Sequence, residues 1–139
     1  LNIAVNKIKD STGLTIDLNN IPINDEKALL LFAQGKTKGI FQFEGGQARK
    51  LCREVAVGGE FNFNDVVAIN ALNRPGPLDA GLTERYVKIR QGRFNATYPH
   101  PKAENALRET HGVMVYQEQI MQMTRDLCGF SMSEADTLR

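Results

Sequence analysis

Apolar residues recur at helical spacing along most of this chain, and this spacing limits the fold more than any other feature. In residues 46–56, Ala48, Leu51, Cys52 and Val55 stand at i, i+3, i+4 and i+7, on one face of a helix. Similar stripes, bounded by glycine, proline and capping residues, predict further helices. These cover residues 2–10, 24–34, 62–74, 79–91, 102–109 and 113–128, and another begins at Ser131 or Ser133.

Extended structure has little support in the sequence. Residues 39–43 form a short apolar run that suits a strand or an extended piece, and residues 14–18 suit an extended connector. We therefore predict a predominantly α, multi-helical fold with seven or eight helices and at most a short strand.

The composition is that of an ordinary globular protein. Hydrophobic residues make up 42% and charged residues 24% of the 139 positions, and no apolar run reaches the length of a membrane span. Cys52 and Cys128 fall in helical patterns, so we expect reduced, buried thiols and a cytoplasmic protein. Neither cysteine has a histidine at metal-ligand spacing, so no zinc site is expected. The chain begins without methionine and stops within a helical pattern, so we expect an excised segment of a longer protein.

Positive charge gathers in two islands. Residues 35–54 and residues 74–93 each carry five basic residues against two acidic residues. An anionic partner would suit both islands, and solvated helix faces would explain them equally well.

The first island contains a possible phosphate-binding corner. Gly45 and Gly46 precede the helix over residues 46–56, and backbone N–H groups at a helix start can bind an anion. Arg49 and Arg53 stand one turn apart on the side away from the apolar stripe. The alternative is an ordinary loop.

The second island begins at Arg74, which is followed by Pro75, Gly76 and Pro77. The first proline predicts a helix end at Arg74, and the two prolines predict a stiff corner that holds the arginine. The alternative is a rigid turn with an exposed arginine.

Three glutamines lie together in the helix predicted over residues 113–128: Gln117, Gln119 and Gln122. Their amides could hydrogen-bond bases or backbone without the desolvation penalty of a charge. They could equally bond neighbouring loops.

The usual catalytic motifs are missing from the sequence. It has no Gly-x-Ser-x-Gly elbow and no Walker-type loop, and its aspartates are scattered without an Asp-x-Asp pair. Because two-metal phosphoryl transfer needs clustered carboxylates, we identify no complete catalytic centre in this chain.

Four strings in fixed order carry a family resemblance: residues 37–44 (TKGIFQFE), 73–78 (NRPGPL), 98–101 (YPHP) and 111–122 (HGVMVYQEQIMQ). Together they resemble the α subunit of bacterial DNA polymerase III, a C-family replicative DNA polymerase. Residues 135–139 resemble the start of that family's arginine-containing fingers helix. One departure is Gly45-Gly46, where the family usually has a serine and a basic residue.

The resemblance implies that residues 1–36 connect the palm to the fingers and that residues 37–139 are a helical fingers-region segment, truncated at its C-terminus. It implies a part of a DNA-directed DNA polymerase, a nucleotidyltransferase of DNA replication. The Mg²⁺ ligands of such an enzyme lie on the palm, so the fragment is expected to bind no metal and to be inactive alone. The implied partners are primer–template DNA, dNTP and the rest of the polymerase chain. The sliding clamp and other replisome subunits would bind other regions, and no membrane is involved.

The position of the motifs also implies roles for individual residues. Four cations are candidates to lie near the triphosphate or the primer–template backbone: Arg49, Lys50, Arg53 and Arg74. Three residues are candidates to line the nascent base pair: Gln42, Tyr116 and Gln117. A rival hypothesis is a stand-alone helical module that binds nucleic acid or protein without catalysis. A third treats the basic islands as solubilising only.

Overall fold

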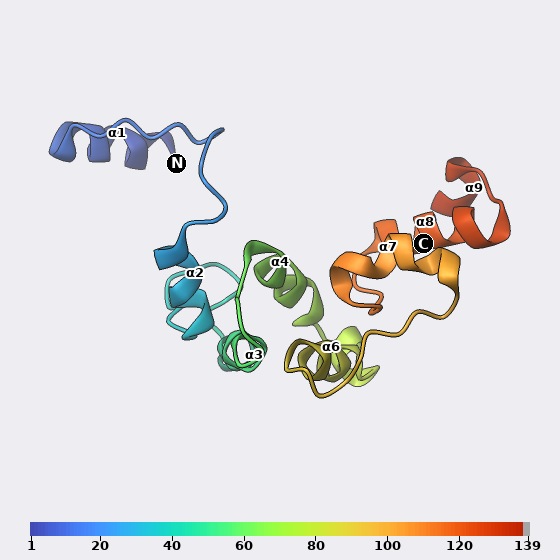
Figure 1. Ribbon diagram of the computed structural model, residues 1–139. Coiled ribbons are helices and arrows are strands. Elements are labelled where there is room, and N and C mark those ends of the chain that lie inside the picture. The colour runs from blue at the N-terminus through green and yellow to red at the C-terminus, as the bar shows by residue number, and fades with distance from the viewer. Residues whose placement is uncertain (138–139) are drawn as a thin grey trace.

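The computed structural model describes residues 1–137, and helices are the only regular elements in that range (Figure 1). The α-helices are α1 Asn2–Thr12, α2 Glu26–Ala33, α3 Gly46–Ala56, α4 Phe63–Leu72, α5 Pro75–Asp79, α6 Leu82–Arg90, α7 Glu104–Leu107, α8 Gln117–Cys128 and α9 Met132–Asp136. Two 3₁₀ turns, η1 Pro101–Ala103 and η2 Arg108–Thr110, flank α7. The predicted predominantly α fold is confirmed. The end of the predicted fingers helix, residues 138 and 139, lies outside the described residues.

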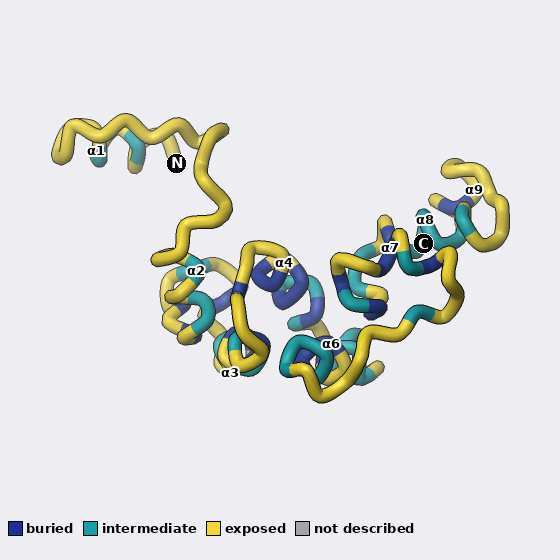
Figure 2. Tube along the Cα trace, viewed as in Figure 1, coloured by how far each residue is buried: buried dark blue, intermediate teal, exposed yellow. Residues whose placement is uncertain are grey.

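The main core lies where α3 meets α2, α4 and α6. Buried residues, dark blue in Figure 2, gather on α3, α4 and α6 around this core. The predicted helix over residues 46–56 is confirmed, and its stripe of Ala48, Leu51, Cys52 and Val55 is buried. From α4 and α6 the core receives Ile69, Leu72 and Tyr86, each 1% exposed.

A second, smaller cluster forms around α7. Ala103, Ala106 and Leu107 are buried there, and Tyr98 and Met123 pack against them. Helix α8 therefore covers η1 and α7, and it also packs against α9. The predicted start of α9 is confirmed, because the Ser131 hydroxyl accepts from Glu134 N while the Glu134 carboxylate accepts from Ser131 N.

The N-terminal part of the chain has a different character. Helix α1 has no buried residue, and it stands apart from the other helices in Figure 1. By contrast α2 packs on α3, and the rings of Phe32 and Phe43 meet edge to face with centroids 5.2 Å apart. The functional division between residues 1–36 and 37–139 stays a prediction. No helix among the described residues is long and apolar enough to cross a membrane.

The predicted strand or extended piece over residues 39–43 is wrong, because this segment forms successive turns. Ile40 N donates to Thr37 O, and Phe43 N donates to Ile40 O. The buried Thr37 hydroxyl closes the segment by donating to Phe43 O over 2.7 Å. Gly39 and Gln42 have φ angles of 86° and 65°, which a strand cannot accommodate.

Three predicted helix boundaries also need correction. The helix predicted from residue 79 begins at Leu82, because residue 79 is the last residue of α5. Helix α4 ends at Leu72 rather than Arg74, and the Pro-Gly-Pro corner is the first turn of α5, because proline fits the first helical positions. Helix α8 begins at Gln117 rather than Val113, since residues 113–116 are not helical and Tyr116 is the N-cap. Val113 nevertheless is buried in the main core.

The prediction for the thiols holds for one cysteine only. Cys52 is fully buried in the core, and burial raises its pKa to about 11. Cys128, the last residue of α8, is exposed.

The loop after α3 lies directly against the end of α6. A Cβ atom added to Gly58 would stand 1.6 Å from the carbonyl oxygen of Arg90, so only glycine fits at this position. Gln91 Nε2 donates to the carbonyl of Glu54 over 2.9 Å on the same seam.

Candidate nucleic-acid interface

The first group of predicted site residues surrounds the junction of α2 and α3. The Nε of Arg49 donates to the carbonyl of Gly35 over 3.0 Å, so Arg49 fixes the chain that leaves α2. Arg53, one turn later, lies against the same glycine, because a Cβ at Gly35 would stand 2.6 Å from its Nη1. Arg49 therefore has a structural role alongside any contact with an anion.

Lys50 has an acidic partner among the described residues and Arg53 does not. Lys50 pairs with Glu54 on the next turn at 3.7 Å, and its side chain is 60% exposed. Such an exposed pair contributes little to stability and can be exchanged for another anion. Arg53 is exposed and has no acidic partner among residues 1–137.

The start of α3 keeps the features expected of the phosphate-binding corner. Gly45 is the N-cap, and no side chain caps the first N–H groups of the helix. Gln42 is exposed in the turn just before, with a left-handed backbone. Glu44 closes that turn by accepting from Gly39 N over 2.9 Å. Phosphate binding at this corner stays a prediction.

Arg74 occupies the corner between α4 and α5. It is exposed, its backbone is extended, and its guanidinium has no hydrogen bond or ion pair within the part of the chain that the structure describes. The helix end beside it is firmly held, because the buried hydroxyl of Thr83 donates to the carbonyl of Leu72 over 2.9 Å. The corner therefore presents a free cation on a fixed support.

Tyr116 and Gln117 lie at the start of α8. Tyr116 is half-buried, and burial together with the nearby Glu109 carboxylate raises the pKa of its hydroxyl. Gln117 is exposed in the first turn of the helix. The Tyr116 ring borders a cavity of about 390 Å³ between α7 and α8, which Asn105, Arg108, Glu109, Glu118 and Gln122 also line.

Of the three glutamines in residues 113–128, Gln119 bonds neighbouring segments of the protein and is not available to bond a base. Its side chain is 6% exposed and bonds neighbouring backbone rather than facing solvent. The carbonyl Oε1 accepts from Val115 N at 2.8 Å and from Tyr116 N at 2.9 Å. The amide Nε2 donates to Ala106 O at 3.0 Å and to Thr110 Oγ1 at 2.8 Å.

The predicted residues thus form three groups: the turn and outer face of α3, the α4–α5 corner, and the start of α8. Packing of α3 against α4 and α6 fixes the first two groups on one helical body. No hydrogen bond or ion pair joins the three groups to one another within residues 1–137. The roles assigned to the seven residues stay predictions.

Comparison with known proteins identifies the family. All 139 residues match the family described as "Bacterial DNA polymerase III alpha subunit finger domain". The chain belongs to this family.

Individual relatives agree with the finger-domain assignment. The chain is 42% identical over 139 residues to a protein named DNA polymerase III subunit alpha from Halalkalibacterium halodurans, and 45% identical over 140 residues to one from Yersinia pestis. Each comparison covers 100% of this chain and 12% of the relative. A relative of the same name from Aquifex aeolicus is 43% identical over 132 residues, which are 95% of this chain and 11% of that protein. The chain thus spans about one-eighth of the length of these relatives.

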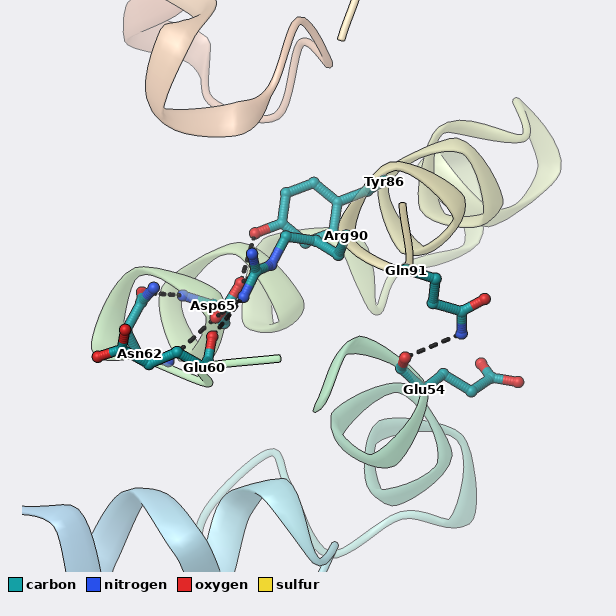
Figure 3. A network of polar contacts seen from close by, with 7 residues as sticks. All are labelled: Glu54, Glu60, Asn62, Asp65, Tyr86, Arg90 and Gln91. Atoms are coloured by element: carbon teal, nitrogen blue, oxygen red, sulfur yellow. Dashed lines mark hydrogen bonds and ion pairs between the residues drawn. The ribbon is translucent and has the colours of Figure 1, made fainter. Parts of the chain in front are cut away.

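The finger domain contains a buried ionic network that the sequence analysis did not find (Figure 3). Asp65, 2% exposed on α4, pairs with Arg90 at the end of α6, with Nε 2.8 Å from Oδ1. Nη2 of Arg90 donates to Asp65 Oδ2 at 2.9 Å and to the carbonyl of Glu60 at 2.6 Å. The Nε contact is an ion pair without a well-aligned hydrogen bond. Arg90, on α6, therefore connects the α3–α4 loop at Glu60 with α4 at Asp65.

Only the part of this network that joins Asn62 and Asp65 corresponds to a local sequence pattern. Asn62 and Asp65 form a capping box, in which each side chain accepts from the backbone N–H of the other residue. That spacing is visible in the sequence. The arginine that completes the network stands far away in the chain, and no local pattern links it to Asp65.

His111 adjoins the same network in the finger domain. Its ring centroid lies 5.8 Å from that of Tyr86, and its backbone is left-handed with a φ of 55°. Burial lowers the pKa of His111, Arg90 lowers it further, and Asp65 opposes the shift. Within the described part of the chain, no three His, Cys, Asp or Glu side chains are grouped as a metal site.

Proposed function

We propose that this chain positions the incoming dNTP and the primer–template in a replicative, C-family DNA polymerase. The observation that carries the proposal is the match of the whole chain to the finger-domain family. Because the chain spans about 12% of its relatives, the proposal assigns the nucleotidyl transfer itself to the larger protein. The segment alone is then inactive.

Phosphoryl transfer of this kind depends on positioning and on neutralising the charge of the triphosphate. Arg53 and Arg74 are exposed and have no acidic partner among residues 1–137, so they are best suited to contact phosphate. Lys50 can exchange its exposed pairing with Glu54 for a phosphate. Arg49 keeps Nε on Gly35, which leaves the rest of its guanidinium available.

The half-buried ring of Tyr116 offers an apolar face for a nucleobase, and the amides of Gln42 and Gln117 can hydrogen-bond base edges without desolvating a charge. We assign these three residues to the nascent base pair. The proposal places the Mg²⁺ ligands on other parts of the polymerase, where the ion would supply charge neutralisation at the triphosphate.

The partners follow from the same proposal. Primer–template DNA and dNTP would contact this segment, together with the rest of the polymerase chain. A sliding clamp and other replisome subunits would bind elsewhere on the protein, in the cytoplasm. The two basic islands fit this choice of an anionic partner.

Replacing Arg74 by alanine in the intact polymerase tests the proposal. Losing a charge-assisted phosphate contact should lower kcat/KM for dNTP by roughly tenfold or more. The thermal unfolding temperature should not change, because the Arg74 side chain has no partner among the described residues. Lys9→Ala is the control, since Lys9 on α1 is also exposed and has no ion pair within residues 1–137 but lies outside both basic islands. Equal kcat/KM values for Arg74→Ala and the control would show that Arg74 does not contact the nucleotide or DNA.

A further inference from the structure

We propose that Gln119 is a positioning residue, which places the Tyr116 ring by holding the backbone N–H groups of Val115 and Tyr116. The inference rests on the proposed role of Tyr116 at the nascent base pair. It adds a residue that acts through Tyr116 and does not itself touch nucleotide or DNA.

The hydrogen-bonding capacity of Gln119 is fully used. A glutamine amide has two donor hydrogens and a carbonyl oxygen with two lone pairs. Both hydrogens go to Ala106 O and Thr110 Oγ1, and both lone pairs accept backbone N–H groups. These partners fix the orientation of the amide, because the carbonyl of Ala106 can only accept and the two N–H groups can only donate.

The four bonds join three segments at one point. Ala106 belongs to α7, Thr110 belongs to η2, and Val115 and Tyr116 are the last residues before α8. The Thr110 hydroxyl in turn donates to Leu107 O at 3.3 Å, so the chain of bonds continues into α7. Gln119 therefore anchors the non-helical segment of residues 113–116 to the α7–η2 unit.

This anchor matters for Tyr116 in particular. Tyr116 is the N-cap of α8, where the backbone changes from extended to helical, with φ of −110° and ψ of 147°. The N–H groups of residues 115 and 116 bond the Gln119 side chain, so this side chain determines the angle at which the chain enters the helix. The entry angle sets where Tyr116 stands in the lining of the cavity between α7 and α8.

A double-mutant cycle in the intact polymerase tests the inference. Gln119→Glu keeps the size of the side chain and both acceptors, but its carboxylate cannot donate to Ala106 O. Losing this buried bond should raise KM for dNTP about tenfold, with a smaller change in kcat, because placement of the base changes before chemistry. If Gln119 acts through the tyrosine, Gln119→Glu should raise KM no further when Tyr116→Ala is already present.

Two further variants keep the test decisive. Thr110→Val removes one acceptor of the Gln119 amide with little change in shape. It should raise KM about threefold and replaces Gln119→Glu in the cycle if that variant does not fold. Gln91→Glu is the structural control, since it breaks a glutamine bond to the Glu54 carbonyl away from Tyr116, and it should leave KM unchanged.

The outcomes separate the inference from the proposed function. Additive effects of Gln119→Glu and Tyr116→Ala would overturn the positioning role and leave the proposed function intact. An unchanged KM in Tyr116→Ala would refute the role of Tyr116 itself, and with it the positioning role. A rise in KM for Gln91→Glu equal to that of Gln119→Glu would show that general loosening of the fold is responsible.

Discussion

The hydroxyl of Tyr86 donates a hydrogen bond of 3.0 Å to Oδ1 of Asp65, and both side chains are almost completely buried. The bond crosses from α6 to α4 and lies beside the Asp65–Arg90 ion pair. Burial and the Asp65 carboxylate both raise the pKa of Tyr86 far above its usual value, so Tyr86 remains a donor at every physiological pH.

Substitutions in this pair should have very different effects on the free energy of unfolding. Asp65→Ala leaves the partly buried guanidinium of Arg90 without its countercharge. It also removes the acceptor of the Tyr86 hydroxyl and the capping box with Asn62, so it should lower stability by about 3–5 kcal/mol. Tyr86→Phe removes a single hydroxyl, while Asp65 keeps Arg90 and Asn62 N, and should lower stability by about 1 kcal/mol. Urea denaturation followed by circular dichroism measures both values. Similar losses in the two variants would mean that the ion pair contributes no more than one ordinary hydrogen bond.

Gly35 provides a test of the contact between α2 and α3. Gly35→Ala would place a methyl group 2.8 Å from Arg49 O and 2.6 Å from Arg53 Nη1, at a residue whose φ is 64°. Gly13→Ala is the matched control, because Gly13 has a φ of 73° and no neighbour within 4 Å of the added carbon. The control should cost about 1 kcal/mol of stability for the left-handed backbone, and Gly35→Ala should cost roughly 1–3 kcal/mol more because of crowding. Equal losses in urea denaturation would show that the two arginines move aside freely.

Stability should fall in mild acid because of His111. Its pKa is lower in the folded protein than the usual value of about 6.5. As the pH falls through that value, the unfolded chain takes up a proton before the folded chain does, so the folded state becomes less stable. His111→Asn suits the left-handed backbone and should reduce the loss of stability between pH 7.5 and pH 5.5. The measurement is the unfolding midpoint in urea at each pH, and an identical loss in both proteins would assign the effect to other groups.

Local patterns predicted much of the fold correctly. The stripe in residues 46–56 identified α3 with its bounds and its buried face, because burial of one helix face leaves a direct periodicity in the sequence. The helix start at Ser131 or Ser133 could also be predicted, because a short polar side chain before a helix satisfies a backbone N–H group within the same segment.

The errors arose where side-chain hydrogen bonds and ion pairs, rather than apolar periodicity, decide the structure. Residues 39–43 have the composition of a strand, but the Thr37 hydroxyl folds them back as turns. Residues 113–116 continue the periodicity of α8, but Gln119 takes their N–H groups, and two of its partners lie in α7 and η2. Arg90 looks like a surface residue at a helix end until the fold brings Asp65 beside it. No spacing within one helix contains that information.

For the candidate site, too, the sequence predicted exposed polar residues but not the contacts that the fold gives them. Chemistry and motif position selected the seven residues, and the exposure of Arg53, Arg74, Gln42 and Gln117 agrees with contact to a ligand. The sequence could not show that Arg49 is bonded to Gly35, because that contact depends on how α2 approaches α3. It also could not show which of three similar glutamines would be buried.

Gly58 has no functional group, yet no other residue can replace it, because the carbonyl of Arg90 occupies the space that a side chain would need. Even the smallest chiral amino acid there would push the last turn of α6 away, and the Arg90 guanidinium would then be withdrawn from its anchorage on Asp65. A change at this residue would act by displacing main chain rather than by altering a binding group, so a search for essential positions confined to charged and polar residues would overlook it.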